Sequence, residues 1–174
     1  MRIDQYEHFY GAALVQIVED KHFPVVRAMK LKGGRVQSAF QVNDDACICF
    51  KYASKSGRGS SWGDYSFNFN RQSLDELRRV ESAGYTVWLG LICVGGKEIC
   101  CVPFKLLLSM IEERRSWMEY RFPERDADEC SIGVDLQPGK FFRVGISAPW
   151  SIKKVAIKEH KIPRNAFPRK ILRG

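Results

Sequence analysis

The pattern of apolar and polar positions divides the first part of the chain into one helix and three strands. Between Tyr6 and Val18, apolar side chains recur at helical spacing, which predicts an amphipathic helix. Three strands are predicted to follow, at Val25–Leu31, Val36–Asn43 and Ala46–Ala53. The third is apolar along almost its whole length, as is typical of a central strand that is buried on both faces.

A loop rich in glycine and serine, at residues 54–63, is followed by a different pattern. Tyr65–Asn70 alternates between apolar and polar positions, which predicts a half-buried strand. A second helix is predicted to begin at Ser73, where Glu76 completes a capping box. It is predicted to end near Gly84, because glycine is favoured just after a helix.

The second half of the chain is predicted to hold four further strands and one helix. The strands are Tyr85–Val94, Glu98–Val102, Ser131–Leu136 and Phe141–Ile146, and the helix is Phe104–Tyr120. We therefore expect an α/β (α+β) fold with three helices and a mixed, largely antiparallel sheet, followed by a C-terminal β appendix. Residues 1–152 are expected to form a single domain, and residues 153–174 a basic C-terminal segment.

Length and composition agree with an intracellular globular protein. The chain has 174 residues, enough for one domain with a sizeable core. No apolar run approaches the roughly 20 residues that span a bilayer. The N-terminus is acidic and amphipathic, unlike a signal peptide. We therefore expect a cytoplasmic protein without a membrane partner.

The six cysteines are consistent with that compartment. They include no C-x-x-C pair, and most lie in apolar strand-like runs, where a reduced thiol behaves as a small hydrophobic side chain. Cys100 and Cys101 are adjacent, so they would point to opposite faces of a strand. We expect reduced, mostly buried cysteines, and neither a bound metal nor a cofactor.

Basic residues are concentrated towards the C-terminus. The formal net charge is +8, and between Lys153 and Gly174 only Glu159 is acidic. The basic residues of this segment are Lys153, Lys154, Lys158, Lys161, Arg164, Arg169, Lys170 and Arg173. This uneven distribution predicts a polyanionic partner such as nucleic acid. The alternative is a solvated tail that only aids solubility.

The loop after the predicted central strand is a second candidate for contact with nucleic acid. Lys51, Lys55 and Arg58 alternate with small residues, and Trp62 follows them. Basic groups of this kind contact phosphates while an aromatic ring stacks on a base. The alternative is a plain strand connection in which Trp62 packs into the core.

The element order also resembles a known superfamily. From Asp4 to Val94, the order α-β-β-β-α-β resembles the core of the restriction-endonuclease-like superfamily, whose active members carry a PD-(D/E)xK site. The short pieces "FKYASK", "WGDYSFNFN" and "LICV" also look similar to an uncharacterised family of small bacterial proteins. The nuclease resemblance implies carboxylates that hold Mg²⁺ and a lysine that helps to orient the nucleophile.

The chain departs from that motif at an important position. Lys51 takes the place of the lysine, but the acidic position two residues earlier holds Cys49. A thiol is a poor ligand for a hard cation. The candidate replacement acids are Asp44, Asp45 and Asp64, with Glu7 as a further one. Asp44 and Asp45 are also predicted to form a two-residue turn, which would leave Asp45 about 20 Å from Lys51 along the strand.

These observations support three hypotheses. The first is a nucleic-acid-binding protein on a nuclease-like core whose metal site is degenerate. The second is a divalent-metal-dependent nuclease that uses Lys51 with one of the replacement acids and needs Mg²⁺. The third is a protein-interaction or regulatory module. It would be expected to expose an apolar patch around Phe141, Phe142 and Trp150.

Overall fold

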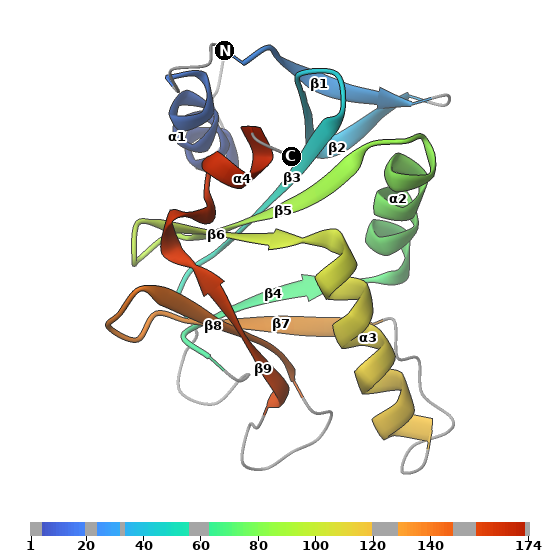
Figure 1. Ribbon diagram of the computed structural model, residues 1–174, viewed down its shortest axis with the longest axis vertical. Coiled ribbons are helices and arrows are strands. Elements are labelled where there is room, and N and C mark those ends of the chain that lie inside the picture. The colour runs from blue at the N-terminus through green and yellow to red at the C-terminus, as the bar shows by residue number, and fades with distance from the viewer. Residues whose placement is uncertain are drawn as a thin grey trace.

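The described part of the chain forms two β-sheets and three long helices, and the two sheets lie one after the other along the longest axis of the molecule (Figure 1). The computed structural model describes residues 5–19, 24–31, 34–55, 63–119, 129–147 and 156–172. The helices in these ranges are α1 (Gln5–Val18), α2 (Arg71–Ser82), α3 (Phe104–Glu119), the 3-10 helix η1 (Arg164–Ala166) and the short α4 (Arg169–Leu172). The strands are β1 (Val26–Leu31), β2 (Gly34–Val42), β3 (Ala46–Ala53), β4 (Tyr65–Phe69), β5 (Thr86–Cys93), β6 (Glu98–Pro103), β7 (Cys130–Asp135), β8 (Phe141–Ser147) and β9 (Ala156–Pro163).

The first sheet has five strands in the order β1-β2-β3-β5-β6. β3 and β5 are parallel, with α2 in the connection between them, and the other neighbours are antiparallel. β3 therefore lies in the middle of the sheet, which explains its continuous apolar sequence. The predicted α+β class and the mixed, largely antiparallel character of this sheet are confirmed.

The expected C-terminal β appendix is part of a second sheet, which also takes in β4 from the first half of the chain. β4 pairs with β7, and β8 and β9 complete an antiparallel sheet in the order β4-β7-β8-β9. Asn68 and Ser131 face each other in this pairing, although they are 63 residues apart in the sequence. Pairing over such a distance depends on tertiary contacts, so the local pattern did not reveal it.

The part of the basic C-terminal segment that the structure describes, residues 156–172, belongs to the fold. β9 pairs with β8, and the chain then passes through η1 into α4. Ile162, Phe167 and Ile171 are buried in the core. The sequence analysis assigned no element here, because charged side chains interrupt the apolar alternation of β9. β9 is an edge strand, and lysines on an edge strand discourage pairing with another chain.

The turn between β2 and β3 is one residue longer than expected. It comprises Asn43, Asp44 and Asp45, and Asn43 has a φ of 54°, a left-handed conformation that asparagine tolerates better than most residues. Asn43 Oδ1 accepts a hydrogen bond of 3.0 Å from the Val25 N–H. This bond ties the turn to the residue before β1 and favours the longer turn.

Helix α2 begins at Arg71 and not at Ser73, because Asn70 provides the N-cap. Asn70 Oδ1 accepts hydrogen bonds from the Ser73 N–H at 2.8 Å and from Ser73 Oγ at 2.7 Å. Asparagine and serine are comparably good caps, so the sequence did not distinguish the two starts. Glu76 consequently lies deeper in the helix than a capping box requires.

We expect Asn70→Ala to lower the free energy of unfolding by about 1 kcal/mol, because the Ser73 amide would lose its capping partner. Asn70→Asp keeps an accepting oxygen and adds a negative charge at the helix N-terminus, so it should retain the stability. Urea unfolding followed by circular dichroism measures both variants. An equal loss in the two variants would contradict the capping role.

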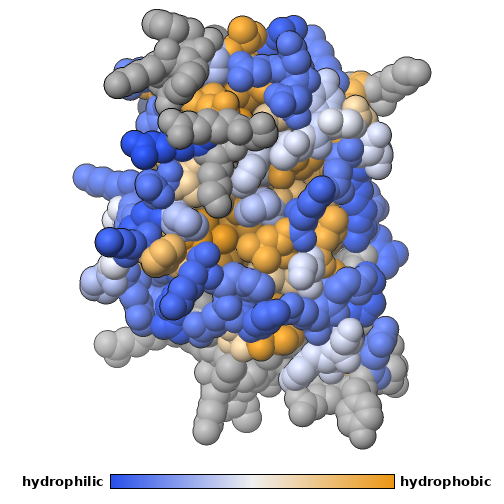
Figure 2. Space-filling view, in the orientation of Figure 1, coloured by the Kyte–Doolittle hydropathy of each residue, from blue (hydrophilic) through white to orange (hydrophobic). Residues whose placement is uncertain are grey.

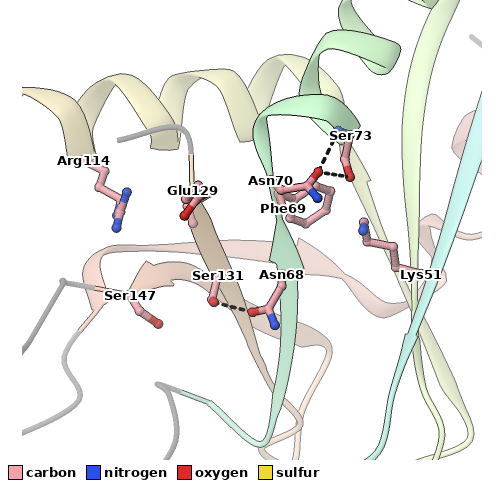
Figure 3. A pocket seen from close by; sticks show the side chains of 10 residues that line it. Lys51, Asn68, Phe69, Asn70, Ser73, Arg114, Glu129, Ser131 and Ser147 are labelled. Carbon is pink, nitrogen blue, oxygen red and sulfur yellow. Dashed lines mark hydrogen bonds between the residues drawn. The ribbon is translucent and has the colours of Figure 1, made fainter. Parts of the chain in front are cut away.

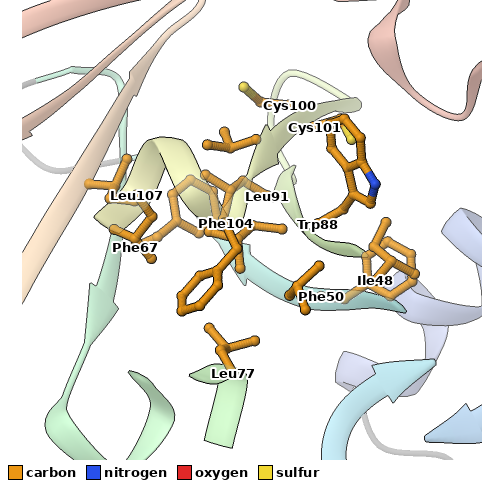
Figure 4. Close-up of a cluster of buried hydrophobic side chains, with 14 of the residues drawn as sticks. Ile48, Phe50, Phe67, Leu77, Trp88, Leu91, Cys100, Cys101, Phe104 and Leu107 are labelled. Atoms are coloured by element: carbon orange, nitrogen blue, oxygen red, sulfur yellow. The ribbon is translucent and has the colours of Figure 1, made fainter. Parts of the chain in front are cut away.

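The helices cover the five-stranded sheet and join it to the second sheet. α1 and α4 contact β3, and α2 contacts β5. α3 contacts β5 and β6 of the first sheet and β8 and β9 of the second, so it bridges the two. Aromatic, aliphatic and cysteine side chains fill the core (Figure 4). Within the described ranges, no helix is both long enough and apolar enough to cross a bilayer.

All six cysteines are free thiols, in agreement with the sequence-based expectation. Five are buried and Cys49 is half-buried. Burial raises the pKa of Cys47 and that of Cys93 to about 12. These thiols are therefore protonated at neutral pH and behave as small apolar core groups.

Candidate functional site

Lys51 lies near the end of β3, where the two sheets approach each other. Side chains alternate along a strand, so Cys49 and Lys51 share one face of β3, the face that lies towards α2. The Lys51 side chain is half-buried, and its Nζ lies 4.8 Å from the centre of the Phe69 ring at the end of β4. This cation–π contact holds the ammonium group at the junction of the sheets.

A hollow of about 470 Å³, here called the Lys51 cleft, opens between β3, the start of α2, α3 and the ends of β4, β7 and β8 (Figure 3). Most of its lining side chains are polar. They are Lys51, Asn68, Phe69, Asn70, Ser73, Arg114, Glu129, Cys130, Ser131 and Ser147. In the view of Figure 3, Lys51 and Arg114 stand on opposite sides of the cleft. Its volume is that of a site for a small ligand.

Arg114 is a site residue that the sequence analysis missed. Arg114 is 6% exposed, and no other charged residue in the described part of the chain is buried. It lies on the face of α3 that carries Leu107, Met110 and Ile111, where an apolar residue is expected. A charge at such a position is the signal that would have identified it, because charged residues are almost never fully buried unless they are paired.

A smaller pocket of about 240 Å³, here called the Cys49 pocket, adjoins the cleft. Lys51 and Ser73 line both spaces. The other residues of the Cys49 pocket are Tyr10, Ser38, Cys49, Phe50, Glu76 and Leu77. Ser38 has a φ of 57°, which is uncommon for a residue other than glycine. Strained backbone of this kind is often found at functional sites.

The electrostatics of the Cys49 pocket do not provide an anionic metal site. Burial raises the pKa of the Cys49 thiol to about 11, while Lys51 lowers it and Glu76 raises it. The thiol is therefore protonated at neutral pH. Glu76 is the carboxylate that lines this pocket, and the sequence analysis had given it only a capping role. Among the described residues, no three His, Cys, Asp or Glu side chains are grouped closely enough to hold a metal ion.

Asp44 and Asp45 are not brought near Lys51. They lie in the turn before β3, at the opposite end of that strand. The Asp44 side chain is 97% exposed and forms a long ion pair of 3.9 Å with Arg27. The carbonyl oxygen of Asp45 accepts a hydrogen bond of 2.7 Å from the Thr86 N–H. Both residues thus serve the turn and lie outside the lining of the cleft and of the pocket.

Asp64 is also separated from Lys51, because it precedes β4 while Lys51 packs at the far end of that strand. Asp64 Oδ2 accepts a hydrogen bond of 3.1 Å from the Leu136 N–H, and Lys55 Nζ lies 3.9 Å from its Oδ1. Burial and the neighbouring Asp64 raise the pKa of Asp135. Asp64 therefore belongs to a separate charged cluster between the start of β4 and the end of β7.

Among the described residues, the basic side chains predicted to contact nucleic acid differ in their contacts: some form ion pairs within the fold and others do not. Lys158 pairs with Glu113 at 2.8 Å, and Arg164 pairs with Glu98, so both are engaged within the fold. Lys158 is still exposed in this ion pair, as are the side chains of Lys55, Lys161 and Arg169. Arg58, Trp62, Lys153, Lys154 and the side chain of Lys170 lie outside the described residues.

The apolar patch expected of a protein-interaction module is only partly formed. Phe141 is 46% exposed, but Phe142 is 1% exposed, and Trp150 lies outside the described residues. A different apolar groove of about 410 Å³ lies between α1 and the β5–β6 hairpin. On the face drawn in Figure 2, hydrophobic side chains reach the surface mainly in the middle, and hydrophilic side chains surround them.

The comparisons with known proteins identify no relative. The chain matches no protein-family model, no curated protein and no solved structure.

Proposed function

We propose that the protein binds nucleic acid through the Lys51 cleft, on a nuclease-like core whose metal site is degenerate. The observation that carries the proposal is the position of Lys51. It is a half-buried cation at the end of the central strand, and it lines a polar cleft of about 470 Å³. An ammonium group held in place by an aromatic ring is suited to a phosphate of a nucleic-acid backbone.

The order of the elements supports the nuclease-like part of the proposal. α1, β1, β2, β3, α2 and β5 follow the order α-β-β-β-α-β, apart from β4, which joins the second sheet. Cys49 and Lys51 stand on β3 of this core at the positions of the acid and the lysine in the resembled motif. The net charge of +8 adds a general attraction for polyanions.

The side chains of the Cys49 pocket, on the acid position of the resembled motif, favour binding over metal-dependent cleavage. A cation such as Mg²⁺ prefers several oxygen ligands, including carboxylates. In the Cys49 pocket, a protonated thiol occupies the expected acidic position, and Glu76 supplies the carboxylate of the lining. One carboxylate with a neutral thiol is a weak donor set for a hard cation.

We expect Lys51→Gln to weaken binding of a labelled oligonucleotide about tenfold, because one charge-assisted phosphate contact is lost. The slope of log affinity against log salt should become shallower by about 0.7–0.9, as one fewer counterion is released. Fluorescence anisotropy over a salt series, with DNA and with RNA, measures both quantities. Thermal unfolding of the variant shows whether the fold is retained.

Lys140→Gln is a matched control for this experiment. Lys140 is exposed and follows β7 at the turn towards β8, whereas the cleft lies at the other end of these two strands. The control removes the same charge and should leave affinity and slope close to the wild-type values. The same change in both variants, or none in Lys51→Gln, would remove the cleft from the interface.

A divalent-metal nuclease is the alternative function, and the position of Glu76 in the same pocket as Lys51 favours it. Cleavage of plasmid or single-stranded DNA by the wild type with Mg²⁺ or Mn²⁺, abolished by Lys51→Ala, would establish this alternative over the binding function. Cys49→Glu is the informative companion variant, since it places a carboxylate two residues before Lys51.

A further inference from the structure

The dimensions of the Lys51 cleft restrict the form of nucleic acid that it can hold. Resting on the proposed function, we infer that the cleft accommodates one unpaired nucleotide of a single strand, with the phosphate near Lys51 and the base towards Asn68 and Ser131. The volume of about 470 Å³ is that of a small-ligand site, bounded by parts of both sheets and by α3. Stacked base pairs are too large for this space, whereas one nucleotide outside the stack fits it.

Two positive features meet on the phosphate side of the cleft. The N-terminal end of α2 contributes Asn70 and Ser73 to the lining, and the first turn of this 12-residue helix contains no acidic residue. Asn70 Oδ1 already accepts from the Ser73 N–H, so α2 favours an anion here mainly through its dipole. The Lys51 ammonium in the same cleft adds a full positive charge. Together they define where a phosphate is most favourable.

Neutral hydrogen-bonding groups line another part of the cleft. The Asn68 side chain is exposed, and its Oδ1 accepts a hydrogen bond of 2.6 Å from Ser131 Oγ. A carboxamide offers donors as well as an acceptor, so it can bind the edge of a base. Ser147 Oγ is shielded from solvent and has no hydrogen-bond partner within the described part of the chain. A polar ligand atom at this end would remove the cost of that unsatisfied hydroxyl.

The described residues that line the cleft offer no exposed aromatic ring on which a base could stack. Phe69 is the aromatic residue there, but it is 1% exposed, and Lys51 lies over its ring. Proteins that bind single strands by stacking tolerate all bases, because every base has an aromatic face. Recognition through Asn68 depends instead on the pattern of donors and acceptors on the base. The cleft should therefore prefer some bases over others.

The test compares labelled single strands of DNA and of RNA, one homopolymer for each base, with a blunt duplex of the same length. Anisotropy at one salt concentration should show at least about tenfold tighter binding of the preferred single strand than of the duplex, since only the strand can enter the cleft. Asn68→Ala should weaken single-strand binding about fivefold and leave duplex binding unchanged. A nucleoside monophosphate should displace the strand more effectively than inorganic phosphate at equal concentration.

Ser66→Ala is the matched control, because Ser66 lies two residues before Asn68 on the same face of β4 but outside the cleft lining. Asn68→Asp provides a second variant, which keeps an acceptor for Ser131 but replaces the donors with a charge that repels phosphate. It should also weaken single-strand binding.

Four outcomes would contradict or limit the inference. Equal affinity for single strand and duplex, or unchanged binding in both Asn68 variants, would overturn the unpaired-nucleotide site. The proposed function would still stand if Lys51→Gln weakened duplex binding. If inorganic phosphate displaced the single strand as effectively as the nucleoside monophosphate did, the proposed contact of the base with Asn68 and Ser131 would be overturned. Absence of binding to every nucleic acid would overturn the inference and the proposed function together.

Discussion

Replacing Phe50 with alanine is expected to lower the free energy of unfolding by about 3–5 kcal/mol, as for other buried phenylalanines. Phe50 lies on β3 and is fully buried. The ring centroids of Tyr10, Phe40 and Phe167 lie 5.8, 5.9 and 6.3 Å from that of Phe50. Truncation would therefore leave a cavity where α1, β2, β3 and the C-terminal segment meet, and these elements cannot all close around it.

Phe141→Ala is the matched control for this prediction. Phe141 is 46% exposed at the start of β8, so the same truncation there should cost less than about 1 kcal/mol. Urea unfolding of both variants measures the difference. Losses of similar size would show that the Phe50 cluster does not carry the stability assigned to it.

The Phe50 ring also accounts for the glycine at position 90 in β5. A Cβ atom at Gly90 would lie 2.4 Å from Phe50 Cδ1, so Gly90→Ala overpacks this part of the core. The expected cost is about 1–3 kcal/mol in the wild-type background. It should be much smaller in the Phe50→Ala background, where the clashing ring is absent. Additive costs in this double-mutant cycle would contradict the contact.

Replacing Arg164 with alanine is expected to lower the free energy of unfolding by about 2–3 kcal/mol, because several partners of one guanidinium group are left unsatisfied. Arg164 forms an ion pair with Glu98. Its Nη2 donates to the carbonyl oxygens of Leu136 at 3.2 Å and Gln137 at 2.7 Å, and the guanidinium lies 4.8 Å from the centre of the Phe142 ring. Arg164 thus links β6, β8 and the loop after β7.

Arg169→Ala is the control, since Arg169 carries the same charge in the same segment but is exposed. It should change stability by no more than about 0.5 kcal/mol. Denaturation curves give the stabilities, and anisotropy at a temperature where both variants are folded gives the affinities. A small loss of stability in Arg164→Ala, together with a shallower slope of log affinity against log salt, would contradict this prediction. It would mean that Arg164 serves nucleic-acid binding more than the stability of the fold.

Local sequence patterns determined most of the secondary structure. The continuous apolar run predicted a central strand at Ala46–Ala53, and β3 has these bounds, because a strand covered on both sides must be apolar throughout. Alternation predicted a half-buried strand from Tyr65, and β4 shows it. The start of α2 was misplaced because Asn70 and Ser73 are both good caps, and their order of preference depends on the surrounding chain.

The candidate site was visible in the sequence only in part. The two-residue repeat of a strand places Cys49 and Lys51 on one face, so this pair followed from the sequence. Which acidic residues lie near this pair did not follow from the sequence. Packing of α2 against the sheet brings Glu76 into the Cys49 pocket, whereas pairing of β4 with β7 carries Asp64 into the second sheet.

The sequence by itself determined where most helices and strands begin and end, which side chains of a strand share a face, and that the thiols are core groups. Only the tertiary structure decided the division into two sheets, the inclusion of β9 and the lining of the Lys51 cleft. The physical reason is the range of the interactions. Periodicity and capping act between neighbours in the chain. Lys51 on β3, Arg114 on α3 and Ser131 on β7 come together only when separate surfaces bury one another.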